Sequence, residues 1–203
     1  MSATVQRPFF AVLLLLSLTA CSYSAFTLTE SDYKPKGKTL AVIAGLNNEV
    51  NVVAAKYVSD ALGADSRFQV VSQSKVDQSL PAYPTNIKGP YKYAYLNIEP
   101  DYSRTDMKKV RDVQQQLGVD YLYVMWAPVS HTVGYQGVQL WFIGQLFEFP
   151  AGKEVGNGIY GAGASGSCLP PSLPRDKEIE DNLKQSMGYV AKKIAEESGM
   201  QKK

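Results

Sequence analysis

The sequence predicts a single α/β domain with a mixed sheet, in the order β-α-β-α-β-β-β-α. In the first half of the chain, short apolar runs suited to strands alternate with amphipathic helical patterns. Three strand-like segments then follow without a helix between them, which is typical of an antiparallel meander. One more amphipathic helix closes the order. We therefore expect a parallel part joined by right-handed crossovers, a meander at one side, and helices over the apolar faces.

The first 20 residues predict an export signal rather than part of the fold. Arg7 provides the positive start, residues 9–18 are apolar apart from one serine, and small residues follow. Residues 18–21, Leu-Thr-Ala-Cys, resemble the lipobox of bacterial lipoproteins. In that family a diacylglycerol is attached to the cysteine sulfur, the chain is cut before it, and the new amine is acylated. The resemblance implies that Cys21 is the first mature residue and carries these chains, palmitate among them; we expect no other cofactor.

The residue after Cys21 bears on which membrane holds the protein. In the proteobacterial pattern an aspartate there retains a lipoprotein at the inner membrane, whereas this chain has Ser22. The resemblance therefore implies the outer membrane, with the protein on its periplasmic face. Each buried CH₂ contributes about 0.8 kcal/mol, so three acyl chains would hold effectively permanently. The alternatives are a plain cleaved signal or an uncleaved anchor.

The boundaries of the mature chain follow from polarity. Residues 22–37 are polar and have no periodic apolar face, which predicts a short tether between lipid and domain. The sequence thus divides into a signal peptide at 1–20, the lipidated cysteine and tether at 21–37, and a periplasmic α/β domain at 38–203.

The domain opens with a β-α-β pattern. Residues 39–44 form a continuous apolar run, as in strands that are covered on both faces. A helix is expected next, because apolar residues recur at helical spacing as far as Leu62, with Asn48 as candidate N-cap and Gly63 as its end. Residues 68–71 predict a second strand.

The middle of the chain is less regular. Residues 72–104 predict no regular element, although they are longer than the usual connection. A second helix is expected over residues 106–117, with Thr105 as its cap and Gly118 as its end.

Strand patterns dominate the second half. Residues 119–129, 138–149 and 154–160 predict the meander, with a proline and glycine turn between the last two. The closing helix has one apolar face. Its residues are Ile179, Leu183, Met187, Val190 and Ile194.

Composition excludes some classes of function. The net charge is only +2, and Arg7 is the one charged residue of the signal, so we expect no nucleic-acid partner. Outside the signal the longest apolar stretch, residues 121–129, is far shorter than the roughly 20 residues of a spanning helix. Lipid is therefore the expected attachment to the membrane.

No residue pattern predicts catalysis or a metal site. His131 is the only histidine and Cys168 the only cysteine besides Cys21. They could form a base and a nucleophile, but no motif orients them, and zinc normally needs three or four ligands. Cys168 is either a buried, inert thiol or a residue that pairs between chains. The glycines of residues 156–161 match a dinucleotide motif without a helix directly after it. We expect no enzyme; a cell-wall or lipid hydrolase is a third alternative.

Tyrosines mark the candidate binding segment, residues 81–102. Tyrosine offers a broad apolar face and a hydroxyl, and loops with rigid aromatic residues are common recognition surfaces. We hypothesise that this segment contacts a protein partner or a glycan strand. The alternative is that the alternating tyrosines pack a small extra strand against the sheet. The candidates are Tyr83, Tyr91, Tyr93, Tyr95 and Tyr102.

Three short stretches resemble a recurring domain of bacterial envelope proteins: residues 40–44 (Leu-Ala-Val-Ile-Ala), 67–71 (Arg-Phe-Gln-Val-Val) and 117–122 (Leu-Gly-Val-Asp-Tyr-Leu). The domain occurs at the amino terminus of the Tol-system protein TolB, in the penicillin-binding-protein activator LpoB and in the curli secretion lipoprotein CsgG. The resemblance covers residues 38–160 and carries no catalytic residue. It implies a membrane-anchored, protein-binding or assembly module of the cell envelope.

The same resemblance implies an alternative, a subunit of an oligomeric secretion or export complex similar to the curli channel lipoprotein. That family inserts β-hairpins into the membrane, and residues 138–160 are the candidate hairpin here. Their apolar residues lie on both faces of the expected strand, which a buried soluble strand explains equally well. Self-association into a homo-oligomer accompanies this alternative.

Overall fold

The computed structural model describes most of the chain beyond residue 21. The predictions for Cys21, Tyr95, His131 and Cys168 fall outside the described residues. These are residues 22–29, 33–35, 37–93, 98–130, 138–164 and 175–202.

The predicted α/β class is confirmed. The strands are β1 (Ser22–Leu28), β2 (Thr39–Ala44), β3 (Gln69–Val70), β4 (Tyr91–Tyr93), β5 (Ile98–Pro100), β6 (Tyr121–Trp126), β7 (Val129–Ser130), β8 (Val138–Glu148) and β9 (Lys153–Ala164). The helices are α2 (Glu49–Asp65), α3 (Gln73–Ser79), α4 (Met107–Leu117) and α5 (Arg175–Glu197), with a 3-10 turn at Tyr102–Arg104. Among the described helices, none is long and apolar enough to cross a membrane.

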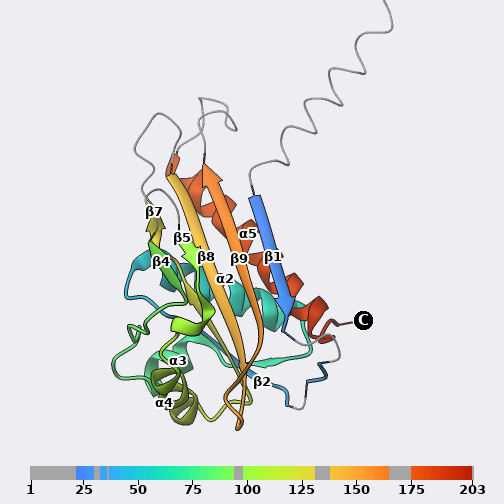
Figure 1. Ribbon diagram of the computed structural model, residues 1–203. Helices are drawn as coiled ribbons and strands as arrows, with labels where there is room; N and C mark the ends of the chain where they lie inside the picture. The colour runs from blue at the N-terminus through green and yellow to red at the C-terminus, as the bar shows by residue number, and fades with distance from the viewer. Residues whose placement is uncertain are drawn as a thin grey trace, which may run out of the picture.

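One mixed sheet runs through the domain (Figure 1). Its strand order is β1-β9-β8-β6-β2-β3, with β7 paired to β8 beside this path. Strands β6, β2 and β3 are parallel, while β6, β8, β9 and β1 pair antiparallel. The predicted meander is confirmed by the consecutive pairing of β6, β8 and β9. Strands β4 and β5 form a separate two-stranded sheet.

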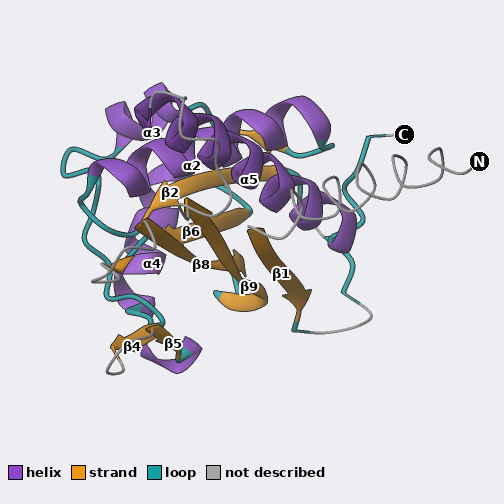
Figure 2. Ribbon diagram, turned by 90° about the horizontal axis from the view of Figure 1, so that it is seen from above, coloured by secondary structure: helices purple, strands orange, loops and turns teal. Residues whose placement is uncertain are grey.

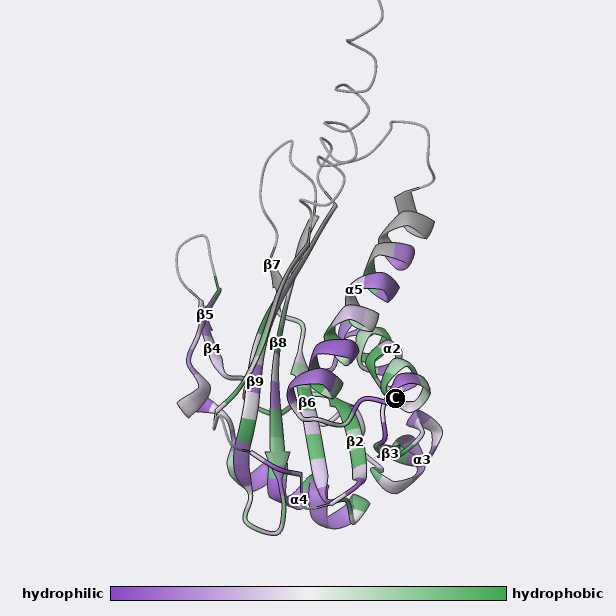
Figure 3. Cartoon of the chain, turned by 90° about the vertical axis from the view of Figure 1, so that its right-hand side faces the viewer, coloured by the Kyte–Doolittle hydropathy of each residue, from purple (hydrophilic) through white to green (hydrophobic). Residues whose placement is uncertain are grey.

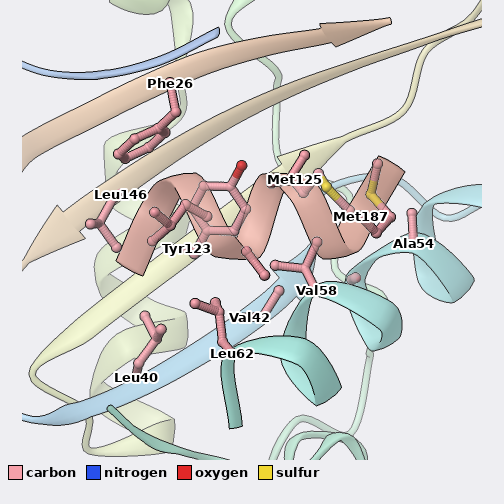
Figure 4. Close-up of a cluster of buried hydrophobic side chains, with 14 of the residues drawn as sticks. Phe26, Leu40, Val42, Ala54, Val58, Leu62, Tyr123, Met125, Leu146 and Met187 are labelled. Carbon is pink, nitrogen blue, oxygen red and sulfur yellow. The ribbon is translucent and has the colours of Figure 1, made fainter. Parts of the chain in front are cut away.

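Helices cover both faces of the parallel strands. Strand β2 is buried along its length: Leu40 and Val42 pack against α2 and α5, and Ile43 faces the cluster that contains residues of α3 and α4. Figure 4 shows Leu40 and Val42 beside Leu62 of α2. Figures 2 and 3 show α2 and α5 on one side of the sheet, and Figure 3 shows β4 and β5 on the other. A strand covered on both sides explains the unbroken apolar run.

Helix ends follow capping chemistry, with two corrections. Asn48 caps α2 as predicted, because its side chain accepts a hydrogen bond from the Asn51 N–H. The helix does not end at Gly63; it continues to Asp65 and is capped by Ser66, whose hydroxyl donates to the Leu62 carbonyl. Asp106, rather than Thr105, caps α4.

The other end of α4 matches its prediction. Gly118 closes the helix with a positive φ of 63°, the left-handed geometry that glycine adopts without strain. Thr105 has a different role from the one expected: it is buried, and its hydroxyl donates to the side chain of Gln145 in β8.

Residues 72–104 contain regular structure that the sequence did not predict. Ser72 caps the short helix α3, and β4 and β5 follow before the 3-10 turn. Of the α3 residues, Val76 alone is buried, so this helix has no apolar periodicity to reveal it. The predicted long irregular connection is therefore wrong.

The predicted tether is also wrong for its described residues. β1 lies in the sheet, antiparallel to β9, from the pair Ser22–Ala162 to the pair Leu28–Gly156. Phe26 is 4% exposed and belongs to the core on the α5 side. This strand has only a short apolar pattern, and its partner edge is supplied by β9, far away in the sequence.

The segment after β1 is fastened by a buried polar cluster. The hydroxyls of Tyr33 and Tyr121 lie 2.7 Å apart, and both reach the same oxygen of Glu148, at 3.0 and 2.8 Å. The pKa of Tyr33 is raised, mainly because the hydroxyl is removed from water, so this hydroxyl stays protonated. Residues that were expected to be free in solution thus belong to the fold.

Glycines in β8 and β9 make room for aromatic rings. A Cβ on Gly144 would lie 1.9 Å from the Tyr123 hydroxyl, and one on Gly156 would lie 2.6 Å from the Phe26 ring. The glycine motif at residues 156–161 lies inside β9. In β9, Gly156 leaves room for the Phe26 ring of the neighbouring strand β1, so side-chain packing explains this glycine of the motif.

Replacing Asp120 with alanine is expected to destabilise the protein by about 2 kcal/mol at pH 7, because its carboxylate holds the start of β2. One oxygen accepts from the Lys38 and Thr39 N–H groups, both at 2.9 Å, and from the Thr39 hydroxyl at 2.7 Å. The Thr39 hydroxyl bond, followed by the backbone bonds, lowers the pKa of Asp120 below its usual 3.8.

A folded-state pKa below the unfolded one means that the stabilisation is complete above pH 4 to 5 and is lost as the pH falls through the folded value. Urea unfolding at pH 7 and at about pH 2.5 checks this: the difference between wild type and Asp120→Ala should shrink at the lower pH. Asp112→Ala, at an exposed site on α4, is the control. An equal difference at both pH values would contradict the prediction.

Candidate functional site

A pocket opens beyond the carboxyl ends of the parallel strands β2 and β6. Leu46 follows β2, and the Ile87 N–H donates to the carbonyl of Gly45 at 2.9 Å. The chain leaves β2 through α2 to β3 on one side and returns through α4 to β6 on the other. This is the topological switch point of the parallel part, the place where open α/β sheets bind ligands.

Trp126, the last residue of β6, positions the back of the pocket. Its indole N–H donates to the Ile87 carbonyl at 2.9 Å, and the side chain is fully buried. Gly89 lies between two rings: a Cβ there would be 2.2 Å from the Tyr91 ring and 2.9 Å from the Trp126 ring. Glycine is therefore the residue that fits at position 89, and the backbone of this segment is held close to the sheet.

Two tyrosines of β4 form one side of the opening. The Tyr91 and Tyr93 rings meet edge to face, with centroids 5.6 Å apart and planes at 84°. Tyr91 is half-buried, whereas Tyr93 is 72% exposed. Pairing with β5 and an ion pair of 3.2 Å between Lys92 and Glu99 support this strand. Burial raises the pKa of Tyr91 to about 12, and Tyr93 adds to this, so Tyr91 is neutral at physiological pH.

The pocket is open to solvent and has a volume of about 660 Å³. Leu46, which is half-buried, supplies apolar surface, while Ile87 is only 1% exposed. One acidic residue lines it, Asp106, and its carboxylate already accepts from the Lys109 N–H at 3.2 Å. The basic residues that line it are Lys88, Lys92, Arg104 and Lys109.

Two of these cations are already bound within the protein. Lys92 pairs with Glu99, and the Lys109 ammonium donates to the Asn86 carbonyl at 2.7 Å. Lys88 and Arg104 are exposed and form no ion pair with any described residue. The pocket therefore combines an apolar floor, an aromatic side and two cations that are available to a ligand.

The structure separates the four described tyrosines of the predicted set, Tyr83, Tyr91, Tyr93 and Tyr102. Tyr91 and Tyr93 come together in the pocket on a small extra strand, which pairs with β5 in a separate sheet and leaves Tyr93 exposed. Tyr83 does not reach the pocket: its hydroxyl accepts from the Ala44 N–H at 3.0 Å and donates to Gln73 at 3.3 Å. Burial raises the pKa of Tyr83 to about 12. Tyr83 thus fastens the loop to β2.

Tyr102 also lies away from the pocket lining. It begins the 3-10 turn, and its carbonyl accepts from the Gln145 side chain at 3.4 Å. Burial first, and then the charge of Glu154, raise the pKa of Tyr102 to about 12. Its surroundings indicate a structural role.

The cations of the pocket were missed in the sequence. Lys88 and Arg104 are 16 positions apart, on either side of the small β4–β5 sheet, and no short motif joins them. The sequence does contain one pattern that could have indicated them: basic residues and tyrosines alternate repeatedly between residues 86 and 109. Only the return of the chain over β2 brings these side chains to one opening.

No protein-family model matches this sequence, and no curated protein does. Among solved structures, a PelC dodecamer from Paraburkholderia phytofirmans is similar with a TM-score of 0.49 and 9% identity, over 86% of this chain and 97% of that one. Lipoprotein GNA1162 from Neisseria meningitidis is similar with a TM-score of 0.44 and 15% identity, over 78% of this chain and 96% of that one. Similarity at this level does not show a function, so the function of this chain is inferred from its own residues.

Proposed function

We propose that this protein is an outer-membrane lipoprotein, anchored through acyl chains on Cys21, that acts as a protein-binding or assembly module of the cell envelope. The observation that carries the binding role is the pocket at the switch point, where Tyr91 and Tyr93 stand beside two available cations. The partner is a segment of another envelope protein that enters this pocket.

The distribution of charge supports anchoring at Cys21. β1 begins at Ser22, which pairs with Ala162, and Val138 pairs with Ala164, so the start of β1, the start of β8 and the end of β9 lie at one end of the sheet. An uncharged end beside lipid avoids the cost of removing charges from water. The three segments that reach this end of the sheet contain no Asp, Glu, Lys or Arg. They are residues 22–29, 138–147 and 155–164.

The lining of the pocket favours binding without catalysis. Among the residues that the structure describes, the lining includes no histidine, cysteine or serine that could act as a nucleophile or base. Asp106 is engaged as the cap of α4, and the raised pKa of Tyr91 opposes its ionisation. These side chains are suited to holding a ligand, which supports a binding role.

Photo-crosslinking in living cells tests the proposal. A photoreactive phenylalanine at position 93 is expected to crosslink to one discrete envelope protein. The matched control is position 189 on α5, because Tyr93 and Tyr189 are the exposed large hydrophobic residues of the described chain, at 72% and 47%. Crosslinks of equal yield from both positions, or none from position 93, would overturn the binding role.

A second candidate function, a subunit of an oligomeric export complex, is favoured by β1. It is an edge strand of seven residues without charge or proline, and such edges tend to pair with other strands. The Thr29 N–H donates to the Val155 carbonyl, so by antiparallel alternation the backbone groups of Phe26 and Leu28 point away from β9. A ladder of self-crosslinked species from a photoreactive phenylalanine at position 27, where Thr27 is exposed on β1, would support this candidate instead.

A further inference from the structure

We infer that the pocket binds an acidic segment of its protein partner, with carboxylates beside Lys88 and Arg104 and a large apolar side chain against Leu46 and Tyr91. This inference rests on the proposed binding function and adds the chemical class of the ligand. It combines three observations: the charge of the lining, the rigid backbone beneath the cations, and the apolar floor.

The charge of the lining is positive, although Glu99 pairs with one of its cations, Lys92. Four lining residues are basic and one is acidic, although the net charge of the whole chain is only +2. The acidic residue, Asp106, points its carboxylate at the first turn of α4. A concave surface lined by one sign of charge concentrates ligands of the opposite sign. The excess of positive charge therefore selects an anionic ligand.

The two available cations extend from backbone that is held in place. The carbonyl of Lys88 accepts from the Asp106 N–H at 3.3 Å, and the Arg104 N–H donates to the Asp101 carbonyl at 3.0 Å. The Asp101 N–H in turn donates to the Pro90 carbonyl at 2.7 Å. The two ends of the β4–β5 excursion are thus tied together. A guanidinium and an ammonium at one opening suit carboxylates, which accept paired hydrogen bonds from arginine.

The apolar floor distinguishes a protein segment from an acidic glycan. Leu46 and Tyr91 are half-buried and form this floor, with the Tyr91 ring packed over Gly89; Ile87, at 1% exposed, offers no surface of its own. An aliphatic or aromatic side chain would fill this floor, whereas a polysaccharide carries no such group. Tyrosine and arginine are also the residues that contribute most at protein interfaces. The observations therefore favour a peptide with both acidic and large apolar residues.

Selection from an unbiased displayed heptapeptide library tests the inference. The target is the mature lipidated protein in a mild detergent. We expect the enriched peptides to carry net negative charge and at least one large apolar residue. A synthetic copy of the most enriched peptide should bind several-fold more weakly at about 300 mM salt than at about 50 mM, because salt screens exposed charges.

Charge reversal provides the matched comparison. Lys88→Glu with Arg104→Glu should weaken binding of that peptide by about tenfold or more. Lys56→Glu with Lys75→Glu makes the same change in net charge at exposed positions on α2 and α3, outside the pocket, and should leave binding within about twofold. Thermal unfolding of both variants verifies that each still folds.

The outcomes separate this inference from the proposed function. Neutral or basic peptides that lose binding in Tyr93→Ser, and not in the charge-reversed variant, would overturn the acidic class and leave the binding role in place. Preference for an oligomer of uronic acid over every enriched peptide would overturn the protein segment as ligand. Peptides that bind the Tyr91→Ser, Tyr93→Ser and charge-reversed variants like wild type would remove the pocket as the binding site altogether.

Discussion

Cells that produce the Cys21→Ser variant are expected to incorporate labelled palmitate into this protein only at background level. The thioether to diacylglycerol requires the cysteine sulfur, and the hydroxyl of serine does not replace it. Without the modification the signal is not removed at this site, so the variant should also migrate as a longer precursor and leave the outer-membrane fraction. This is an all-or-none effect, because the acyl chains are the proposed attachment of the mature protein.

The second cysteine of the chain provides the control. Cys168→Ser also removes one thiol, and it should retain full palmitate labelling and the same membrane fraction. Mass spectrometry of the amino-terminal peptide of the wild-type protein adds an independent readout, since it should show the mass of the acyl chains on Cys21. Labelling that persists in Cys21→Ser would contradict the lipobox interpretation.

The position of β1 sharpens the meaning of this experiment. Because the strand begins at Ser22 and pairs with β9 from its first residue, the lipid would be attached next to the sheet and not at the end of a 16-residue tether. The domain would then be held close to the membrane by its uncharged end. Insertion of a flexible linker after Cys21 should therefore increase the distance between the domain and the membrane. In a protein that already has a long tether, the same insertion would change this distance little.

Gly144→Ala is expected to reduce the free energy of unfolding by about 3 kcal/mol, the largest effect that we expect from one added methyl group. The new Cβ would lie 1.9 Å from the Tyr123 hydroxyl oxygen and 2.4 Å from the ring carbon that carries it. The Tyr123 ring has little freedom to move, because it is fully buried and meets Phe26 edge to face with centroids 6.5 Å apart. Urea unfolding of the mature protein in a mild detergent measures the change.

A second glycine offers a control of opposite sign. Gly188 lies within α5, and a Cβ there would meet no atom within 4 Å. Gly188→Ala should therefore stabilise the protein by up to about 1 kcal/mol, the difference in helix propensity. Adding Tyr123→Phe to Gly144→Ala removes the nearest oxygen and should recover part of the loss. A cost below about 1 kcal/mol for Gly144→Ala would contradict the packing of Tyr123 over this glycine.

Local sequence patterns were sufficient for much of the fold. The apolar run of residues 39–44, the helical spacing that follows Asn48 and the glycine at position 118 each encode structure within one element. Periodicity, caps and turn residues act over a few positions, so they can be read without knowledge of the rest of the chain. The meander was predicted for the same reason, because its strands follow one another directly.

Elements that depend on distant partners were not predicted. β1 has little apolar pattern of its own, and it is a strand because β9 offers an edge some 130 residues later. Helix α3 buries only Val76, and it is stabilised by Ser72 and by its place beside β2. Among the tyrosines, sequence alone gave no means to separate Tyr83, which fastens a loop, from Tyr93, which faces solvent.

By itself the sequence determined the α/β class, the order of the main elements and the resemblance to a lipobox ending at Cys21. Only the tertiary structure decided that residues 22–28 belong to the sheet and that Leu46, Lys88, Tyr91 and Arg104 line one pocket. The physical reason is the crossover: β2 and β6 are neighbours in the sheet but about 80 residues apart in the chain. The side chains at the open ends of these strands meet only after the strands have paired.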